Sequence, residues 1–375
     1  MRDSRSNART SQPVGVELGD RSYEIHVGSG LLARAGDLIA AAAGGGRRFV
    51  VTHPAIERLH GESLRHGLGA VPCETILVPS GERQKSLRRA AALWDALQAA
   101  GADRRSVVVA FGGGVIGDLA GFAAAAYMRG IAYVQIPTTL LAQVDSSVGG
   151  KVAVNHPAAK NLIGAFHQPR LVLADPAVLQ TLRARDYRSG LAEVVKHAAI
   201  ADAEMFAWLE ADTRAAAGRD SSAIARMVRR SCEIKAEVVR RDEREAGLRA
   251  VLNFGHTVGH GLESVMGYSA LRHGEGVAIG MVAAARIGRH LGMCSPQVGD
   301  RLAALLEALR LPTRIPGTSL SGILNAMRSD KKAVDGTPRF VLPRDIGTVQ
   351  AGCEVPSETV SRVLAELGAS TAEEE

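Results

Sequence analysis

The chain has 375 residues, of which 46% are hydrophobic and 22% are charged, a composition typical of globular proteins and unlike that of collagen-like, disordered or disulfide-rich chains. A chain of this length is expected to form two domains. The formal net charge is +6, but the basic residues are dispersed among acids, and only 4% of residues are aromatic. We therefore expect no nucleic-acid binding, whereas an anionic small substrate fits the positive charge.

Membrane and export signals are also missing from the sequence pattern. No uncharged apolar run reaches the roughly 18 residues that a membrane-spanning helix needs. Residues 1–13 and 369–375 are polar and predict a disordered N-terminal tail and an acidic C-terminal tail. The four cysteines are scattered and form no Cys-x-x-Cys pair, which favours a reducing, cytoplasmic location: Cys73, Cys232, Cys294 and Cys353.

The first half of the chain alternates between strand and helix patterns. Strands are predicted at 14–18 and 22–27 around the turn 19–21, and then at 48–52, 73–78, 106–111 and 131–136. Helices are predicted at 31–43 and 86–100, with further helices between the later strands. This alternation predicts an α/β domain over residues 14–182, with a mostly parallel, Rossmann-like sheet covered by helices on both faces.

The second half is predicted to be helical. Helical periodicity covers 186–210, 221–246, 256–266, 274–291, 297–310 and 319–328, and only 339–342 and 348–350 have an extended pattern. We therefore expect an all-α C-terminal domain over residues 183–368. The active site is expected in the cleft between the two domains, because ligand sites prefer domain interfaces.

A glycine-rich turn follows the predicted strand 106–111 and opens a helix. Gly112, Gly114 and Gly117 match G-x-G-x-x-G, whose free N–H groups and helix N-terminus can face a pyrophosphate. An ordinary glycine turn is the alternative. Glu82, in another turn after a strand, can accept hydrogen bonds from ribose hydroxyls or remain a solvated loop acid.

Lysine is rare in this chain, with seven lysines against 38 arginines. The lysines that remain are therefore expected where a compact ammonium group is needed. Lys151 and Lys160 cluster with Asn155 and Asn161 in a segment rich in glycine and polar residues. This composition predicts a loop that holds a phosphorylated or polyhydroxylated ligand, with an ordinary polar loop as the alternative.

An acid and three histidines have the composition of a metal site. Glu193 and Lys196 share one helix face between apolar neighbours, which favours partial burial over a surface ion pair. His256 and His260 are four residues apart, and His273 precedes an apolar helix. Two histidines, a carboxylate and open positions describe a catalytic zinc site, although spacing leaves open which two histidines bind. No Glu follows His256, which excludes the metalloprotease motif.

Eight motifs occur in one order along residues 16–350 and are jointly specific. They are GGGVIGDLAGF, YMRG, QIPTTLLAQVDSSVGGKVAVNHP, KNLIGAFHQP, RSGLAEVVK, DERE, LNFGHTVGHGLE and HGE. With these motifs the chain closely resembles 3-dehydroquinate synthase, one family of the sugar-phosphate cyclases.

The resemblance implies a lyase of the shikimate pathway to chorismate and the aromatic amino acids. Its substrate would be 3-deoxy-D-arabino-heptulosonate 7-phosphate, converted to 3-dehydroquinate and phosphate by transient oxidation with NAD, phosphate elimination, reduction, ring opening and an intramolecular aldol reaction. NAD and zinc, with cobalt as an alternative, would be cofactors. The other interpretations are a related cyclase, such as aminodehydroquinate synthase, and an NAD- and metal-dependent polyol dehydrogenase.

The resemblance also implies roles for individual residues. The implied metal ligands are Glu193, His256 and His273. The implied NAD contacts are Glu82, Lys85, Gly112, Gly113, Gly114, Asp118, Thr138, Thr139, Asp145, Ser146, Lys160, Thr181 and Leu182. The implied substrate and catalytic residues are Asp145, Lys151, Asn161, Lys196, Lys235, Arg249, Asn253, His260 and one of Lys331 and Lys332.

Arg129 of the YMRG motif would reach the substrate of a second subunit, so the resemblance implies a homodimer. One departure concerns NAD. The family has an Asp or Asn near the end of the strand after the first helix, where it touches the adenosine ribose, but residues 51–54 here read Val-Thr-His-Pro. The affinity for NAD is therefore expected to differ.

Overall fold

The computed structural model describes residues 12–157, 159–267, 270–329 and 337–371. The chain divides into two compact units. The N-terminal unit contains residues up to 138 and residues 146–181, whereas the C-terminal unit contains residues 139–145 and the chain from 182 onward. A short segment in the middle of the α/β sequence therefore belongs to the C-terminal unit.

A seven-stranded sheet forms the centre of the N-terminal unit, in the order β1-β2-β9-β6-β5-β3-β4. β1 and β2 are antiparallel, and the other neighbouring strands run parallel. The predicted, mostly parallel sheet is thus confirmed. Its strands are β1 (Val14–Val16), β2 (Tyr23–Val27), β3 (Arg48–Thr52), β4 (Cys73–Leu77), β5 (Val107–Gly112), β6 (Ala132–Pro137) and β9 (Leu171–Ala174).

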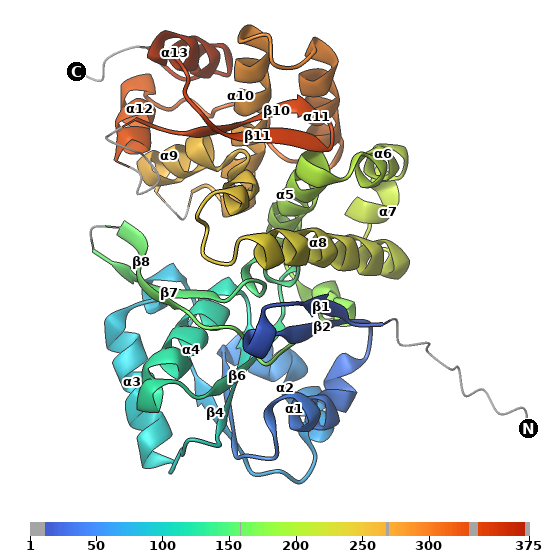
Figure 1. Ribbon diagram of the computed structural model, residues 1–375, viewed down its shortest axis with the longest axis vertical. Helices are drawn as coiled ribbons and strands as arrows, with labels where there is room; N and C mark the ends of the chain where they lie inside the picture. The colour runs from blue at the N-terminus through green and yellow to red at the C-terminus, as the bar shows by residue number, and fades with distance from the viewer. Residues whose placement is uncertain (1–11, 158, 268–269, 330–336, 372–375) are drawn as a thin grey trace, which may run out of the picture. The chain divides into compact units, whose positions relative to one another are not determined.

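Four α-helices surround this sheet, with α3 and α4 along one side and α1 and α2 along the other (Figure 1). Phe49 and Val51 of β3 and Val108 and Ala110 of β5 form a buried cluster with residues of α3 and α4. Every residue of β3 and β5 is buried, as expected for central strands covered on both faces. The helices are α1 (Ala35–Ala43), α2 (Pro54–Leu68), α3 (Leu87–Ala99) and α4 (Gly114–Ala126).

The glycine-rich turn lies where the strand order reverses. From β3 the chain first proceeds outward to β4, and it then returns to place β5 on the other side of β3. The hydroxyl of Thr52, at the end of β3, donates to the carbonyl of Phe111 near the end of β5 at 2.7 Å. Ligands of open α/β sheets bind outside the carboxyl ends of the strands at such a reversal, so the topology favours a ligand site there.

Residues 151–166 correct one prediction. The sequence predicts a polar loop here, but β7 (Lys151–His156) and β8 (Ala159–Phe166) form an antiparallel hairpin, in which Lys151 pairs with Phe166. Val152 and Val154 are buried while their neighbours are more exposed, which is the period of a half-buried strand. The glycines and polar residues of this segment obscured that alternation.

The C-terminal unit is helical, as predicted, apart from one two-stranded ribbon of β10 and β11. The predicted helix 186–210 is two helices, because Asp202 ends α5 and its carboxylate caps α6 by accepting from the N–H of Met205 at 2.9 Å. The elements are α5 (Ala184–Ala201), α6 (Ala203–Ala211), α7 (Thr213–Ala217), α8 (Ser221–Arg241), α9 (His256–Met266), α10 (His273–His290), α11 (Pro296–Ala308), α12 (Leu320–Arg328), β10 (Phe340–Asp345), β11 (Thr348–Cys353) and α13 (Ser357–Glu366).

Glycines bring α9 and α10 into close contact (Figure 1). A Cβ atom on Gly280 of α10 would lie 1.8 Å from the carbonyl oxygen of Gly255, and one on Gly259 of α9 would lie 3.0 Å from the backbone of Gly276. Gly255 also has a φ of +79°, a conformation that favours glycine. The first turns of α9 and α10, which carry His256 and His273, are therefore held together by direct backbone packing.

The ends of the chain lie partly outside the described residues, which begin at residue 12 and end at residue 371. The acidic tail was predicted from residue 369, but Ala369 is buried and the N–H of Ser370 donates to the carbonyl of Thr318 at 2.8 Å; residues 372–375 lie outside the described residues. Within the described part of the chain, no helix combines the length and the apolar character that crossing a membrane requires.

Candidate active site

Three elements of the C-terminal unit bring one acid and two imidazoles together. Glu193 lies in the middle of α5, while His256 and His273 are the first residues of α9 and α10. Nε2 of His256 is 3.7 Å and Nε2 of His273 is 3.3 Å from Oε1 of Glu193. One ligand atom from each residue lies within 4.8 Å of the others. Of the three histidines that spacing left open, the geometry groups these two with the acid.

The donor set fits a divalent metal ion. Glu193 is fully buried and pairs with the ammonium group of Lys196, but neither of its carboxylate oxygens accepts a well-formed hydrogen bond from the described residues. Nδ1 of His256 faces the carbonyl oxygen of Phe254 at 3.2 Å, and Nδ1 of His273 faces Oε1 of Glu263 at 2.7 Å. Because both partners only accept, each Nδ1 carries a proton, and each Nε2, which faces Oε1 of Glu193, is the atom that can present a lone pair to a metal ion. Two imidazoles and a carboxylate with remaining open positions are typical of a catalytic zinc site.

His260 lies beside this donor set. It is one turn after His256 on α9, and its ring centroid is 5.3 Å from that of His256 and 6.2 Å from that of His273. The three rings therefore lie close together, although the close grouping of ligand atoms with Glu193 includes only His256 and His273. This position agrees with the role beside the substrate that the resemblance implies for His260.

A network of charges continues from the metal ligands. Nζ of Lys196 forms an ion pair with Glu193 and lies 3.9 Å from Oδ1 of Asp145. Nζ of Lys235, from α8, donates to both the carbonyl oxygen and Oδ1 of Asp145 at 2.6 Å. Lys196 and Lys235 are almost completely buried. Buried charges need partners, so these contacts hold two ammonium groups beside the donor set.

The charges of this network hold one another in place. Burial raises the pKa of Asp145, but Lys235 and Lys196 outweigh it and keep that pKa well below its usual value. Burial lowers the pKa of Lys196, yet Glu193 and Asp145 raise it overall. The pKa of Lys235 is lowered, because burial and the nearby Arg249 guanidinium outweigh Asp145. Lys235 is therefore the more easily deprotonated of the two lysines.

His197 is a functional candidate that sequence reasoning missed. Its side chain is fully buried, and burial followed by the charge of Lys196 lowers its pKa to about 3. Its Nε2 is 3.8 Å from Oδ1 of Asp145, and one ligand atom each from Asp145, Glu193 and His197 also lie close together. Oδ1 of Asp145 already accepts from Nζ of Lys235 at 2.6 Å, so this second group is a poorer metal site. Its spacing of four from Glu193 was the available signal.

The turn of the DERE motif positions two predicted substrate residues. The carboxylate of Asp242 accepts from three backbone N–H groups, including that of Arg249 at 2.9 Å. The buried guanidinium of Arg249 donates to the carbonyl of Glu243, and Nδ2 of Asn253 donates to Oε1 of Glu245 at 3.0 Å. The motif therefore holds side chains of the short helix 248–253, which leads into His256.

The N-terminal unit holds the glycine-rich turn. Gly113 is the N-cap of α4 and, having no side chain, leaves the first N–H groups of the helix uncapped. A Cβ on Gly114 would lie 3.1 Å from Oγ of Ser146, and one on Gly117 would lie 2.6 Å from Oε1 of Gln135. These glycines therefore permit close packing around the turn, and the helix N-terminus is suited to an anionic group.

Lys85 connects the turn to the hairpin. It is buried, and its ammonium group contacts both Asp118 of α4 and Asn161 of β8. Nδ2 of Asn155 donates to Oε1 of Glu82 at 2.8 Å, while its Oδ1 accepts from the N–H of Asn161 at 3.0 Å. Asn155 was noted in the sequence only as part of a cluster, and the structure shows that it joins two predicted ligand contacts.

The other predicted residues are distributed over both units. Thr138 is buried and follows β6, and Thr139 accepts from the N–H of Ala142 at 3.2 Å through its hydroxyl. Lys151 begins β7 with an exposed side chain, and Arg129 is exposed with a φ of +69°. Gly112 ends β5, and four further residues lie in or beside short turns and β8: Ser146, Lys160, Thr181 and Leu182. Lys331 and Lys332 lie outside the described residues.

His53 has a structural role at the departure from the family pattern. It follows β3, and its Nδ1 accepts from the N–H of Ala55 at 3.0 Å, which caps α2. An Asp or Asn at this position would also be a good N-cap. Capping explains why the imidazole is tolerated there, and it leaves the expected change in NAD affinity as a prediction.

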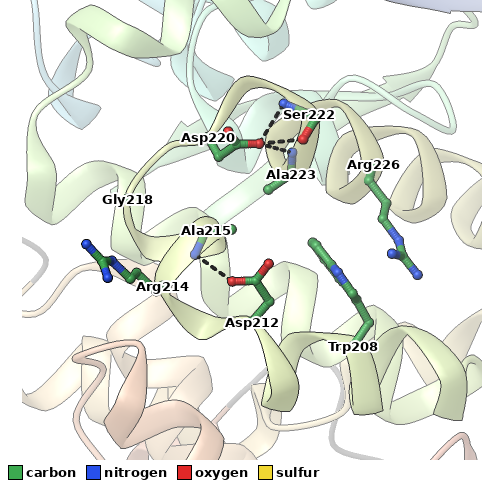
Figure 2. A pocket seen from close by; sticks show the side chains of 9 residues that line it. All are labelled: Trp208, Asp212, Arg214, Ala215, Gly218, Asp220, Ser222, Ala223 and Arg226. Atoms are coloured by element: carbon green, nitrogen blue, oxygen red, sulfur yellow. Dashed lines mark hydrogen bonds between the residues drawn. The ribbon is translucent and has the colours of Figure 1, made fainter.

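A surface depression of about 770 Å³ lies elsewhere in the C-terminal unit (Figure 2). Asp212 and Asp220 accept from backbone N–H groups at the starts of α7 and α8, and Arg226 lies over the ring of Trp208 at 4.3 Å. Both acids of this depression thus act as helix caps, and none of the predicted site residues lines it.

The fold and the site together define a class of enzyme with a glycine-rich, anion-binding turn in an α/β unit and a divalent-metal donor set in a helical unit. Residues 75–189 match the 3-dehydroquinate synthase N-terminal family, and residues 190–333 match the 3-dehydroquinate synthase C-terminal family. A 3-dehydroquinate synthase from Acidithiobacillus ferrooxidans is 48% identical over 351 residues, which are 93% of this chain and 96% of that protein. The chain belongs to the 3-dehydroquinate synthase family, as its motifs predicted.

Solved structures of related cyclases share the fold. A 2-epi-5-epi-valiolone synthase from Streptomyces hygroscopicus subsp. jinggangensis 5008, with NAD⁺ and Zn²⁺ bound, is 32% identical with a TM-score of 0.85, covering 94% of this chain and 98% of that one. A 2-deoxy-scyllo-inosose synthase complexed with carbaglucose-6-phosphate, NAD⁺ and Co²⁺ is 25% identical with a TM-score of 0.88, covering 95% and 100%.

Proposed function

We propose that this chain converts 3-deoxy-D-arabino-heptulosonate 7-phosphate to 3-dehydroquinate and phosphate. One observation carries the proposal: a buried acid and two imidazoles form a metal donor set directly beside two buried lysines, in a chain of the 3-dehydroquinate synthase family. A sugar phosphate offers hydroxyl groups to a metal and a dianion to ammonium groups, so these two features match its two ends.

Glu193, His256 and His273 hold a divalent metal, zinc or cobalt. The metal, when bound, supplies Lewis acidity toward substrate hydroxyl groups, and NAD⁺ supplies a reversible hydride acceptor. The buried, negatively charged Glu193 and the two Nε2 lone pairs provide the ligands. The chain's own contribution is to orient the sugar, exclude water and hold protons and charge in fixed positions.

The lysines and Asp145 organise the substrate. The ammonium groups of Lys196 and Lys235 share the carboxylate of Asp145, which fixes both beside the metal ligands. Lys235 and Lys151 hold the phosphate as negative charge develops on it during elimination, and Arg249 and Asn253 contact the substrate. His260 lies beside the metal ligands and is placed to hold a proton of a substrate hydroxyl group.

The N-terminal unit binds NAD. The uncapped N-terminus of α4 at Gly113 receives the pyrophosphate, and Glu82, held by Asn155, accepts from a ribose hydroxyl. Lys85 with Asp118, and the segments around Thr138, Ser146, Lys160 and Thr181, complete the cofactor contacts. Bound NAD⁺ would supply a hydride acceptor whose hydride returns to the same substrate, so no net NADH is expected.

We also propose that the functional protein is a homodimer in the cytoplasm. Arg129 follows Met128, and both side chains are exposed with positive φ angles at the end of α4. A partner subunit's substrate phosphate provides a charge for Arg129, as the resemblance implies. The four cysteines are free, which is consistent with a reducing compartment.

The nearest alternative is a related cyclase acting on another sugar phosphate. The 48% identity to a 3-dehydroquinate synthase favours the heptulosonate phosphate over the substrate of the 32% identical valiolone synthase. The more distant alternative, a polyol dehydrogenase, would accumulate NADH.

The deciding experiment measures phosphate release and NADH absorbance with the purified protein and 3-deoxy-D-arabino-heptulosonate 7-phosphate. We expect phosphate release without net NADH, loss of activity after chelation, and recovery with added zinc or cobalt. If the protein releases phosphate only from a different sugar phosphate, the substrate assignment is wrong. If NADH accumulates, the reaction type is wrong.

The metal ligands have their own test. Glu193→Gln keeps the shape of the side chain but removes the charge that balances the metal, so we expect the variant to lose stoichiometric metal in elemental analysis. Glu210→Gln, at a partly exposed ion pair with Arg301, serves as the control that removes one acid elsewhere. Full metal occupancy in Glu193→Gln would show that the ligand set is wrong.

A further inference from the structure

A carboxylate outside the predicted ligand set contacts a metal ligand directly. Glu263 is 5% exposed, and its Oε1 accepts from Nδ1 of His273 at 2.7 Å. His256, His260 and Glu263 follow one another at spacings of four and three on α9, so all three side chains lie on one face of that helix. The face of α9 that carries His256 and His260 therefore also carries the carboxylate that hydrogen-bonds to His273, the metal ligand on α10.

The two histidine ligands are held by different partners. Nδ1 of His256 faces a neutral backbone carbonyl, that of Phe254, whereas Nδ1 of His273 faces the charged carboxylate of Glu263. Both acceptors favour the tautomer that carries its proton on Nδ1 and leaves Nε2 available for the metal. A carboxylate does more, because its charge increases the electron-donating strength of the imidazole at Nε2. The two ligands are thus expected to contribute unequally to metal binding.

The backbone fixes this contact. Glycines at the contact of α9 and α10 allow the helices to approach, and the N–H of Gly274, next to His273, donates to Oγ of Ser189 on α5 at 3.0 Å. A carboxylate at this depth without a hydrogen-bonding partner would be strongly unfavourable. The helix contact thus fixes where α9 and α10 meet, and Glu263 of α9 orients the imidazole of His273 through this hydrogen bond.

We propose that Glu263 is a positioning residue that acts through His273: it fixes the tautomer and ring orientation of this ligand and strengthens its bond to the metal. This inference rests on the metal site of the proposed function. It assigns Glu263 no contact with substrate, so its effect is expected first in metal affinity and in the ligand field, and in activity only as a consequence.

The test is a titration of the metal-free full-length protein with Co²⁺, followed by the visible absorption of the bound ion and by competition with a chromophoric chelator. Glu263→Gln is expected to weaken Co²⁺ binding by about 10- to 100-fold and to shift the visible bands. Circular dichroism and the unfolding temperature are recorded for each variant. Should Glu263→Gln fail to fold, Glu263→Asp replaces it, because it keeps the charge but withdraws the carboxylate from His273.

The matched control is Glu275→Gln, two residues after His273 on α10. Glu275 pairs with Arg185 and accepts from the backbone N–H of Arg272, and the amide oxygen of Gln can still accept the latter bond. This variant removes an acid from the same turn without changing the contact to Nδ1 of His273. It is expected to bind Co²⁺ as tightly as the unmodified protein.

The outcomes separate the two proposals. If the unmodified protein fails to bind one equivalent of Co²⁺, the proposed metal site is wrong, and the role of Glu263 falls with it. If the unmodified protein binds Co²⁺ but the Glu263 variant loses less than tenfold in affinity, or Glu275→Gln loses as much, only the role of Glu263 is wrong. Tenfold or greater loss confined to the Glu263 variant, with shifted bands, supports it.

Discussion

Lys235 forms two hydrogen bonds with Asp145: its Nζ donates to both the carbonyl oxygen and Oδ1 of Asp145 at 2.6 Å. One turn earlier on α8, the thiol of Cys232 donates to the carbonyl of Gln143 at 3.3 Å. Side chains of α8 therefore bind the segment 139–145 through its backbone carbonyls and also through the charged carboxylate of Asp145. This attachment positions Asp145 beside Lys196 and the metal ligands.

Asp145→Asn is expected to weaken both catalysis and the C-terminal unit. The variant keeps an acceptor for Lys235 but removes the charge that offsets two buried ammonium groups, and breaking a buried pair typically lowers stability by about 3 kcal/mol. We expect kcat/KM for phosphate release to fall at least about 100-fold, with a lower unfolding temperature. Asp300→Asn, in α11, is the control. Normal turnover in Asp145→Asn would contradict the assigned network.

Lys151→Arg tests whether a compact ammonium group is required at the start of β7. The guanidinium group is planar and bidentate and does not occupy the same point in space. Because Lys151 is exposed at the first position of the hairpin, the substitution should leave the unfolding temperature unchanged. We expect a severe loss of turnover, about 100-fold or more in steady-state phosphate release. Activity close to normal would mean that any cation suffices there.

Asn155→Ala is expected to weaken NAD binding without affecting the metal. The variant frees Glu82, a predicted NAD contact, and removes the acceptor for the N–H of Asn161, a predicted substrate contact on the neighbouring strand. Loss of such hydrogen bonds corresponds to an increase of about tenfold in the Kd for NAD⁺. Calorimetric titration measures this Kd, and Asn325→Ala on the exposed face of α12 is the control. An unchanged Kd would place NAD away from Glu82.

Asp202→Asn tests the pH dependence of stability at the junction of α5 and α6. Burial raises the pKa of Asp202, but hydrogen bonds from Arg230 and from the N–H of Met205 lower it below its usual value. A lowered folded-state pKa stabilises the protein above the unfolded-state pKa, about 3.9, and this contribution is lost as the pH falls through the folded-state value.

We therefore expect Asp202→Asn to melt about 2 °C lower at pH 7, where Asn still caps α6 but lacks the ion pair. The difference should shrink as the pH falls below the unfolded-state pKa of about 3.9. Differential scanning calorimetry across this range measures it, with the exposed Asp212→Asn as the control for surface charge. A difference in melting temperature that grows in acid would contradict the lowered pKa of Asp202.

Local patterns predicted much of the architecture. The buried strands around Phe49 and Val108 were visible as apolar runs, and the burial of Glu193 followed from its apolar neighbours. The hairpin 151–166 was missed, because its polar and glycine residues imitate a loop and only Val152 and Val154 reveal the strand period. Its pairing depends on contacts that periodicity does not encode.

The site was less visible than the fold. Histidine spacing identified a metal-binding composition, but the choice of His256 and His273 depends on how α9 and α10 meet at their glycines. Glu263 and His197 were missed for the same reason, since each is one turn from a recognised residue on a helix whose partner is distant in sequence. Spacing lists the residues on a face, whereas tertiary packing decides which of them touch.

The segment 139–145 has a consequence for the biogenesis of this protein. Its residues are synthesised long before α8, yet they belong to the same unit as Lys235 and Cys232. The helical half thus cannot be expressed as a fragment beginning at residue 182 without leaving Lys235 deprived of its acceptors. Splitting the gene at the apparent domain boundary should therefore destabilise the helical half, and co-expression of the two pieces should restore it only if the segment 139–145 reaches α8.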